Sequence, residues 1–167
     1  MTECSWLQSY PEGMPSELPP LTYGSLVDLL DEAFEAHADK TAYSFLGQPF
    51  SFADTERHSR ALGAYLQSLG LNAGDRVAIM MPNVPQYPMA VAAILRAGLV
   101  VVNVNPLYTA SELAHQLQDS GAKAIFILEN FAATLQKCLA QTAVEHVVLC
   151  AMGDCLGLKG LLVNGVV

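Results

Sequence analysis

Four polar residues near the end of a short apolar run carry side chains that can exchange hydrogen bonds with a ligand. The run spans residues 100–104, and the four residues are Asn103, Asn105, Tyr108 and Thr109. β-Branched residues in a run of this length indicate a strand. In an open α/β sheet, ligands bind where strands end at their carboxyl side. These residues are therefore candidates for substrate contact. The alternative is that their hydrogen bonds hold the loop itself.

Two further side chains near this segment could take part in chemistry. His115 lies one turn after Glu112 in an expected helix, a spacing that favours pairing of the two on the helix surface. A catalytic base is the alternative for His115. Arg96 is the only charged residue between Arg76 and Glu112, and we expect a solvated cation at a helix C-terminus. Neither pattern assigns a catalytic residue.

Sequence motifs for phosphate, metal and nucleophile sites do not occur in the chain. It contains no Gly-x-Gly-x-x-Gly, no Gly-x-x-x-x-Gly-Lys-Ser/Thr, no His-Glu-x-x-His and no Gly-x-Ser-x-Gly. The cysteines form no Cys-x-x-Cys pair and have no histidine at metal-ligand spacing: Cys4, Cys138, Cys150 and Cys155. We therefore assign no catalytic residue, no cofactor-binding residue and no metal ligand, and we expect reduced thiols in the cytoplasm.

The elements that position these residues alternate between helix and strand. Capping signals and apolar spacing predict helices at 25–38, 51–70 (with Ser51-x-x-Asp54 as its start), 85–97, 109–119 and 130–140. Apolar runs predict a hairpin at 42–46 and 49–52, turning at Gly47-Gln48, and strands at 76–80, 100–104, 124–128 and 147–150. This alternation is typical of an α/β fold with a doubly wound, mostly parallel sheet. We divide the chain into a Pro-rich N-terminal arm, residues 1–24, and an α/β unit, residues 25–167, with an apolar tail at 158–167.

The composition bears on the partners of the chain. The net charge is −8, and residues 1–40 hold eight acidic residues against Lys40 alone, so no basic surface exists for nucleic acid or a polybasic membrane anchor. Residues 77–95 carry no charge, but Pro82, Pro85 and Pro88 interrupt them, which favours strand, loop and helix over a transmembrane span. Hydrophobic residues make up 52% and charged residues 14%. These values predict a deeply buried sheet, a face covered by a neighbour, or both, and self-association of the chain alone.

Four segments of the sequence resemble the acyl-adenylate-forming, AMP-binding enzymes. They are residues 50–56 (Phe-Ser-Phe-Ala-Asp-Thr-Glu), 74–79 (Gly-Asp-Arg-Val-Ala-Ile), 81–88 (Met-Pro-Asn-Val-Pro-Gln-Tyr-Pro) and 103–109 (Asn-Val-Asn-Pro-Leu-Tyr-Thr). The first is an imperfect copy of the family's Leu-Thr-Tyr-x-Glu-Leu motif. The last two are most similar to the bacterial long-chain fatty acid–CoA ligases. The resemblance runs collinearly along the whole chain.

The resemblance implies that this chain is the first subdomain of such a ligase, cut before the phosphate-binding loop. The full-length parent is expected to use ATP, Mg²⁺ and CoA to make a fatty acyl-CoA through an acyl-adenylate. The fragment alone is expected to bind none of them and to be inactive, and its expected partners are the remaining domains of the same ligase. The expected location is cytoplasmic, with peripheral contact with the inner membrane face open for the parent. The alternatives are a stand-alone flavodoxin-like binding module and a dimerisation module.

Overall fold

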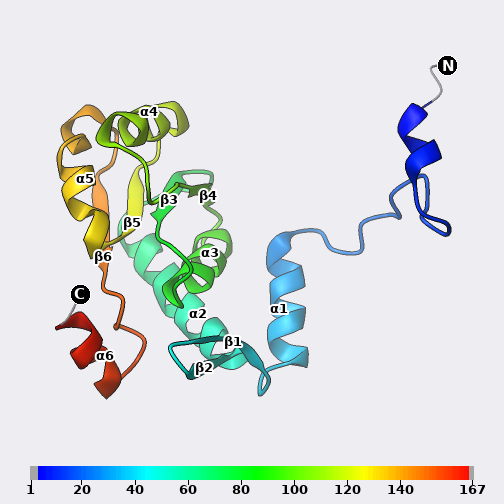
Figure 1. Cartoon of the computed structure of the whole chain (residues 1–167), viewed down its shortest axis with the longest axis horizontal. Helices are drawn as coiled ribbons and strands as arrows, with labels where there is room; N and C mark the ends of the chain where they lie inside the picture. The colour runs from blue at the N-terminus through cyan, green and yellow to red at the C-terminus, as the bar shows by residue number, and fades with distance from the viewer. Residues whose placement is uncertain (1–3, 166–167) are drawn as a thin grey trace.

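A four-stranded parallel sheet forms the centre of the protein (Figure 1). The computed structural model describes residues 4–165. The sheet has the order β4-β3-β5-β6, and its strands are β3 (Arg76–Met80), β4 (Val100–Asn103), β5 (Ala124–Leu128) and β6 (His146–Cys150). Every residue of β5 is buried, as expected of a strand that is covered on both faces. The predicted α/β fold with a doubly wound parallel sheet is confirmed.

Two pairs of helices cover the two faces of the sheet. Successive strand residues point to opposite faces, so Val77 and Ile79 pack in one apolar cluster while Ala78 and Met80 pack in another. The first cluster includes Leu66 of α2 and Ile94 of α3, and the second includes residues of α4 and α5. The bounds of these helices are α2 (Phe52–Ser68), α3 (Gln86–Arg96), α4 (Ala110–Ser120) and α5 (Ala132–Gln136).

The strand order creates a switch point between β3 and β5. These strands are neighbours, with Val77 opposite Ala124, yet the chain leaves β3 toward α3 and leaves β5 toward α5 on the opposite face. The carboxyl ends of these two strands therefore lie at the kind of position where open α/β folds bind ligands. By contrast, β4 is an edge strand within residues 4–165, and its carboxyl end lies one strand away from this switch point.

A helix and a hairpin precede the sheet. They are α1 (Leu26–Ala36), β1 (Thr41–Phe45) and β2 (Gln48–Ser51), and the hairpin strands pair antiparallel. The turn lies at Leu46-Gly47, one residue before the expected Gly47-Gln48. Both residues have positive φ, 48° and 79°, as a two-residue hairpin turn of matching twist requires. Leucine at such a position is unusual, which is why the sequence did not indicate it.

The segment after β5 departs from the expected single helix at 130–140. It contains the 3₁₀ turn η2 (Glu129–Phe131), then α5, then the 3₁₀ turn η3 (Leu139–Gln141). The break occurs at Cys138, whose N–H bonds to the carbonyl of Leu135 in the tighter 3₁₀ pattern. The buried Cys138 packs against the sheet cluster that includes Leu135. Tertiary packing thus replaces the regular helix that the spacing predicted.

The first and last described segments of the chain lie far apart (Figure 1). Residues 4–24 contain one 3₁₀ helix, η1 (Ser5–Ser9), and extend away from the body. At the other end lies α6 (Leu158–Asn164). Residues 1–3 of the predicted arm and residues 166–167 of the predicted tail lie outside the described residues, and the division at residue 24 stays a prediction. No helix within residues 4–165 is long and apolar enough to cross a bilayer.

Candidate functional site

Asn103 ends β4 and anchors the loop that follows it. Its Oδ1 atom accepts a hydrogen bond from the hydroxyl of Tyr87 on α3 at 2.6 Å. Its backbone carbonyl accepts a hydrogen bond from Nε2 of Gln116 on α4 at 2.9 Å. Because Asn103 is exposed, solvent still reaches the side chain that these contacts orient. The two bonds tie the edge strand to a helix on each face of the sheet.

The next two candidates shape the loop from within. The Oδ1 atom of Asn105 accepts a hydrogen bond from the N–H of Leu107 at 3.0 Å, and its carbonyl accepts one from the N–H of Tyr108. This is a side-chain-stabilised turn of the kind that asparagine favours. Tyr108 is partly buried and packs against the cluster below α4. Tyr108 also lines a cavity of about 420 Å³ together with Glu112 and His115 of α4.

Thr109 begins α4 as the expected capping residue. Its hydroxyl accepts a hydrogen bond from the N–H of Glu112, and the Glu112 carboxylate accepts one from the Thr109 N–H at 2.8 Å. Hydrogen bonds from the Thr109 hydroxyl and backbone N–H lower the pKa of Glu112. Among the described residues, His115 makes no hydrogen bond or ion pair with Glu112. The expected His115–Glu112 pairing is therefore wrong, because the carboxylate is already held at the helix N-terminus.

Arg96 is not the solvated cation that its position predicted. Its side chain is only 16% exposed, and its Nη2 atom lies 2.6 Å from Oδ1 of Asp31 on α1. The guanidinium carbon lies 6.0 Å from the ring centroid of Phe34, also on α1. The Nε atom of Arg96 is buried without a hydrogen-bond partner. The expectation failed because α1 packs over the C-terminal end of α3, a contact that local sequence does not reveal.

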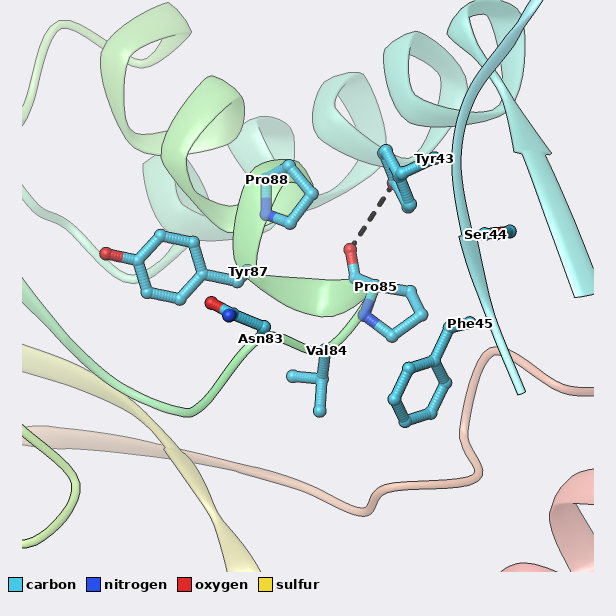
Figure 2. Close-up of a pocket in the computed structure, with 8 residues that line it drawn as sticks. All are labelled: Tyr43, Ser44, Phe45, Asn83, Val84, Pro85, Tyr87 and Pro88. Carbon is cyan, nitrogen blue, oxygen red and sulfur yellow. Dashed lines mark hydrogen bonds between the residues drawn. The ribbon is translucent and has the colours of Figure 1, made fainter. Parts of the chain in front are cut away.

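The loop after β3 lines a cavity that the sequence did not single out. Asn83, Val84 and Pro85 form one wall, and Tyr87 belongs to the start of α3 (Figure 2). Tyr43 and its neighbours on β1 form the opposite wall of this space of about 250 Å³. The signal was present, since residues 81–85 follow strand 76–80 at its carboxyl end in the same way that residues 104–109 follow β4.

Two hydrogen bonds at its hydroxyl, one donated and one accepted, hold Tyr43 in place. The hydroxyl donates to the carbonyl of Pro85 at 3.4 Å, the dashed contact in Figure 2. The hydroxyl of Thr55 on α2 donates to the Tyr43 oxygen at 3.1 Å. Burial raises the pKa of Tyr43 above its usual value, although the bond from Thr55 opposes that shift. The phenol therefore stays protonated at neutral pH and serves as a hydrogen-bond donor.

A second, larger cavity adjoins the first and is more apolar. Its volume is about 410 Å³, and it shares Tyr43, Tyr87 and Pro88 with the smaller one. Phe34 of α1 and Phe52 of α2 complete its apolar walls. Tyr87 thus lines both cavities and also holds Asn103 through its hydroxyl. The structure brings the candidate loop and the two cavities together through this one side chain.

These features provide apolar contact surface and hydrogen-bonding hydroxyls. Within residues 4–165, no three side chains from His, Cys, Asp and Glu gather in a group that could hold a metal ion. The linings of the two adjoining cavities contain no carboxylate, so these cavities do not fit Mg²⁺, and we derive no step through it. Burial raises the pKa of the Cys150 thiol to about 11, which keeps it protonated. The arrangement can bind and orient an apolar group, and the direct ligand role of the four candidates stays a prediction.

Comparison with known proteins places these features in a larger context. A family model described as AMP-binding enzyme matches residues 30–161. A long-chain-fatty-acid–CoA ligase from Escherichia coli O157:H7 is 55% identical over 164 residues, which cover 97% of this chain and 29% of that protein. A long-chain-fatty-acid–CoA ligase from Bacillus subtilis (strain 168) is 38% identical over 151 residues, covering 90% of this chain and 27% of that protein.

Two solved structures of CoA ligases have the same fold as this chain. The crystal structure of a long-chain-fatty-acid–CoA ligase from Archaeoglobus fulgidus has a TM-score of 0.72 at 27% identity, over 83% of this chain and 30% of that one. An anthranilate CoA ligase in complex with anthranoyl-AMP has a TM-score of 0.73 at 23% identity, over 82% of this chain and 27% of that one, and shares the fold. The chain spans less than a third of the length of the curated relatives it matches.

Proposed function

The chain belongs to the AMP-binding enzyme family, and we propose that it forms the N-terminal part of a long-chain fatty acid–CoA ligase. The observation that carries the proposal is the 55% identity to such a ligase across 97% of the chain. In the proposed reaction, the fatty acid carboxylate attacks the α-phosphate of ATP, giving acyl-adenylate and pyrophosphate. The thiol of CoA then takes the acyl group and releases AMP.

Within that reaction, we assign this chain a scaffolding and positioning role. The chain has no glycine-rich phosphate loop, and residues 4–165 contain no group of candidate metal ligands. ATP, Mg²⁺ and CoA therefore belong, in this proposal, to the parts of the ligase that lie beyond the matched region. Residues of this chain shape the sheet on which those parts assemble.

The four candidate residues are proposed to hold the loop after β4 in place, with direct ligand contact as the alternative. The support is local: Asn103 is bonded to Tyr87 and Gln116, and Thr109 caps α4. In a ligase, this role predicts that Tyr87→Phe and Asn103→Ala cause similar, small losses of activity, because both break one bond. A direct ligand role for Asn103 predicts a far larger loss for Asn103→Ala alone, with a raised KM.

A chimeric ligase tests the proposed function. Residues 1–167 replace the matched segment of the Escherichia coli O157:H7 ligase, and formation of long-chain acyl-CoA from ATP, Mg²⁺, CoA and a long-chain fatty acid is measured. We expect activity within about tenfold of the parent ligase, because the matched segment is 55% identical. The 167-residue chain alone should show only background pyrophosphate release.

Matched controls separate folding from function in this assay. The unmodified Escherichia coli O157:H7 ligase gives the highest activity expected. A chimera with Ile125→Asp on β5 gives the activity expected of an unfolded protein, because a charged side chain would replace the fully buried Ile125. A chimera that folds but makes no acyl-CoA contradicts the proposal. That outcome would favour a stand-alone binding or dimerisation module.

The location of the parent follows from the same proposal. We propose that the parent is a cytoplasmic ligase with peripheral contact with the inner membrane face. The described helices provide no membrane span. Fractionation of cells that express the chimera checks this: the enzyme should appear in the supernatant, with a membrane-bound share that salt or carbonate washing removes.

A further inference from the structure

The larger of the two cavities beside Tyr43 is bounded by four separate elements. Its volume of about 410 Å³ falls within the range of about 300–1,000 Å³ that is typical of small-molecule sites. Side chains of α1, β1, α2 and α3 all line it. Phe34 of α1 and Ala92 of α3 are only 4% and 3% exposed, so packing in the core holds these parts of the wall. The cavity is therefore a preformed feature of the fold.

The three hydroxyl groups in the wall of this cavity are already bound to protein atoms. The hydroxyl of Tyr43 donates to the carbonyl of Pro85, and the hydroxyl of Thr55 donates to the Tyr43 oxygen. The hydroxyl of Tyr87 donates to Oδ1 of Asn103. The other side chains that line the cavity contain only carbon and hydrogen, and none of the described lining residues is charged. The wall therefore offers a ligand apolar contact and no spare hydroxyl donor.

Such a wall favours a ligand whose buried part is a hydrocarbon. A docked peptide segment would carry N–H and C=O groups into the cavity, and these groups are costly to bury without hydrogen-bond partners. A hydrocarbon chain has no such groups. Each methylene group that it buries strengthens binding by up to about fourfold. The proposed reaction already includes one molecule with such a chain, the long-chain fatty acid.

We propose that this cavity binds the hydrocarbon chain of a fatty acid, with the carboxylate outside in the solvent. The choice of a fatty acid rests on the proposed function, which makes it the substrate of the parent ligase. The carboxylate stays outside because the wall holds no cation for it. Arg96, which lies against the lining residue Phe34, is already paired with Asp31 at 2.6 Å.

Titration of the 167-residue chain with decanoate tests this proposal. In spectra of the methyl groups, the signals of Leu30, Val91 and Ala92 should shift and reach saturation, because these residues line the cavity. From hexanoate to decanoate, the dissociation constant should fall by up to about fourfold for each added methylene group. Decanol should bind about as tightly as decanoate, since the head group lies in solvent. Binding of decanoate without binding of decanol would contradict that placement and overturn the proposal.

Two variants fill the cavity from different walls. Ala92→Leu adds a larger side chain from α3, and Ala42→Leu adds one from β1. Each should weaken decanoate binding by at least about tenfold, because each takes the space of about two methylene groups of the ligand. The thermal midpoints should stay at or above that of the parent, since filling an apolar cavity adds contacts. Ala133→Leu, an exposed position on α5, is the matched control and should bind decanoate like the parent.

Exposed leucines of α6 are a second apolar surface to which decanoate could bind. Leu158, Leu161 and Leu162 are 86%, 73% and 74% exposed. The triple variant Leu158→Gln, Leu161→Gln, Leu162→Gln should therefore keep the full affinity for decanoate. Loss of binding in this variant overturns the proposal. Unchanged binding in both cavity-filling variants overturns it as well.

The N-terminal arm is a further possible occupant, and its removal separates the two cases. If an apolar side chain of the arm fills the cavity, deleting residues 1–24 shifts the signals of Val91 and Ala92 without any ligand. Such shifts, together with no response of the intact chain to decanoate, assign the cavity to the arm and overturn the proposal. Unchanged signals after the deletion, with the same affinity for decanoate, support it.

The binding experiment and the test of the proposed function give separate answers. Decanoate binding is measured on the 167-residue chain, whereas acyl-CoA formation is measured on the chimeric ligase. Saturable binding by the chain beside an inactive chimera supports the binding site and contradicts the proposed function. An active chimera beside a chain whose methyl signals do not respond to decanoate supports the proposed function and overturns the binding site.

Discussion

Replacing Gly160 with alanine should destabilise the protein, although alanine is the better helix former. The substitution gains about 1 kcal/mol in helix propensity. The added methyl group, however, would overlap the carbonyl group of Gly153, which is backbone and cannot rotate away. Overpacking costs typically about 1–3 kcal/mol, and a backbone neighbour places this site near the upper end. We therefore expect a net loss of about 2 kcal/mol in the free energy of unfolding.

The alternative to a strained contact is detachment of α6, and it leads to a similar cost. Detachment uncovers Leu156, which is 6% exposed and packs with Phe50 and Met89. Exposing a buried leucine costs about 1.5–3 kcal/mol. It also breaks the hydrogen bond between the Gly153 N–H and Asn164. Both routes predict a lower urea midpoint, and detachment adds faster hydrogen exchange at residues 158–164.

Urea unfolding of the 167-residue chain measures the effect. Gly63→Ala is the matched control, because Gly63 is also inside a helix but its added methyl group would lie 3.3 Å from the Ala93 carbonyl, a tight contact rather than an overlap. The control should stay within about 1 kcal/mol of the parent, since the gain in propensity and the tight contact oppose each other. A Gly160→Ala protein with an unchanged midpoint and unchanged exchange would refute the close approach of Gly153 and Gly160.

Three further predictions concern the caps and the surface. Thr109→Ala should lower the free energy of unfolding by about 1 kcal/mol, the usual value of an N-cap, and Thr22→Ala in the exposed arm should leave it unchanged. Hydrogen bonds from the backbone N–H and side chain of Ser51, with Arg57, lower the pKa of Asp54 from 3.8 to about 2. Because the pKa of Asp54 is lower in the folded state, its ionised carboxylate stabilises the fold above about pH 4, and this stabilisation is lost as the pH falls toward 2. Urea titrations should therefore show that the difference in free energy of unfolding between the parent and Asp54→Asn shrinks over that pH range. The chain alone should self-associate through Leu158, Leu161 and Leu162 of α6, which are 86%, 73% and 74% exposed. Light scattering after size exclusion should show a dimer or larger species, and changing these three leucines to glutamine should reduce its share. A parent chain that stays monomeric on concentration would contradict this prediction.

Local sequence was sufficient for the elements that local interactions define. The capping boxes at Ser51 and Thr109 are both present, because each needs only residues three positions apart. The apolar runs became the strands of a parallel sheet, since a strand covered on both faces needs hydrophobic residues throughout. The family resemblance likewise followed from contiguous segments, and the comparisons confirm it.

Tertiary structure decided what depends on residues distant in sequence. Arg96 is partly buried because Asp31 and Phe34 contact it from a helix about 60 residues earlier in the sequence. Glu112 does not pair with His115, because two possible partners compete for one carboxylate and only geometry decides between them. The cavities at Tyr87 and the outward leucines of α6 arise from how elements are placed against one another. Periodicity shows that a helix has an apolar face, but only the fold shows whether that face is covered.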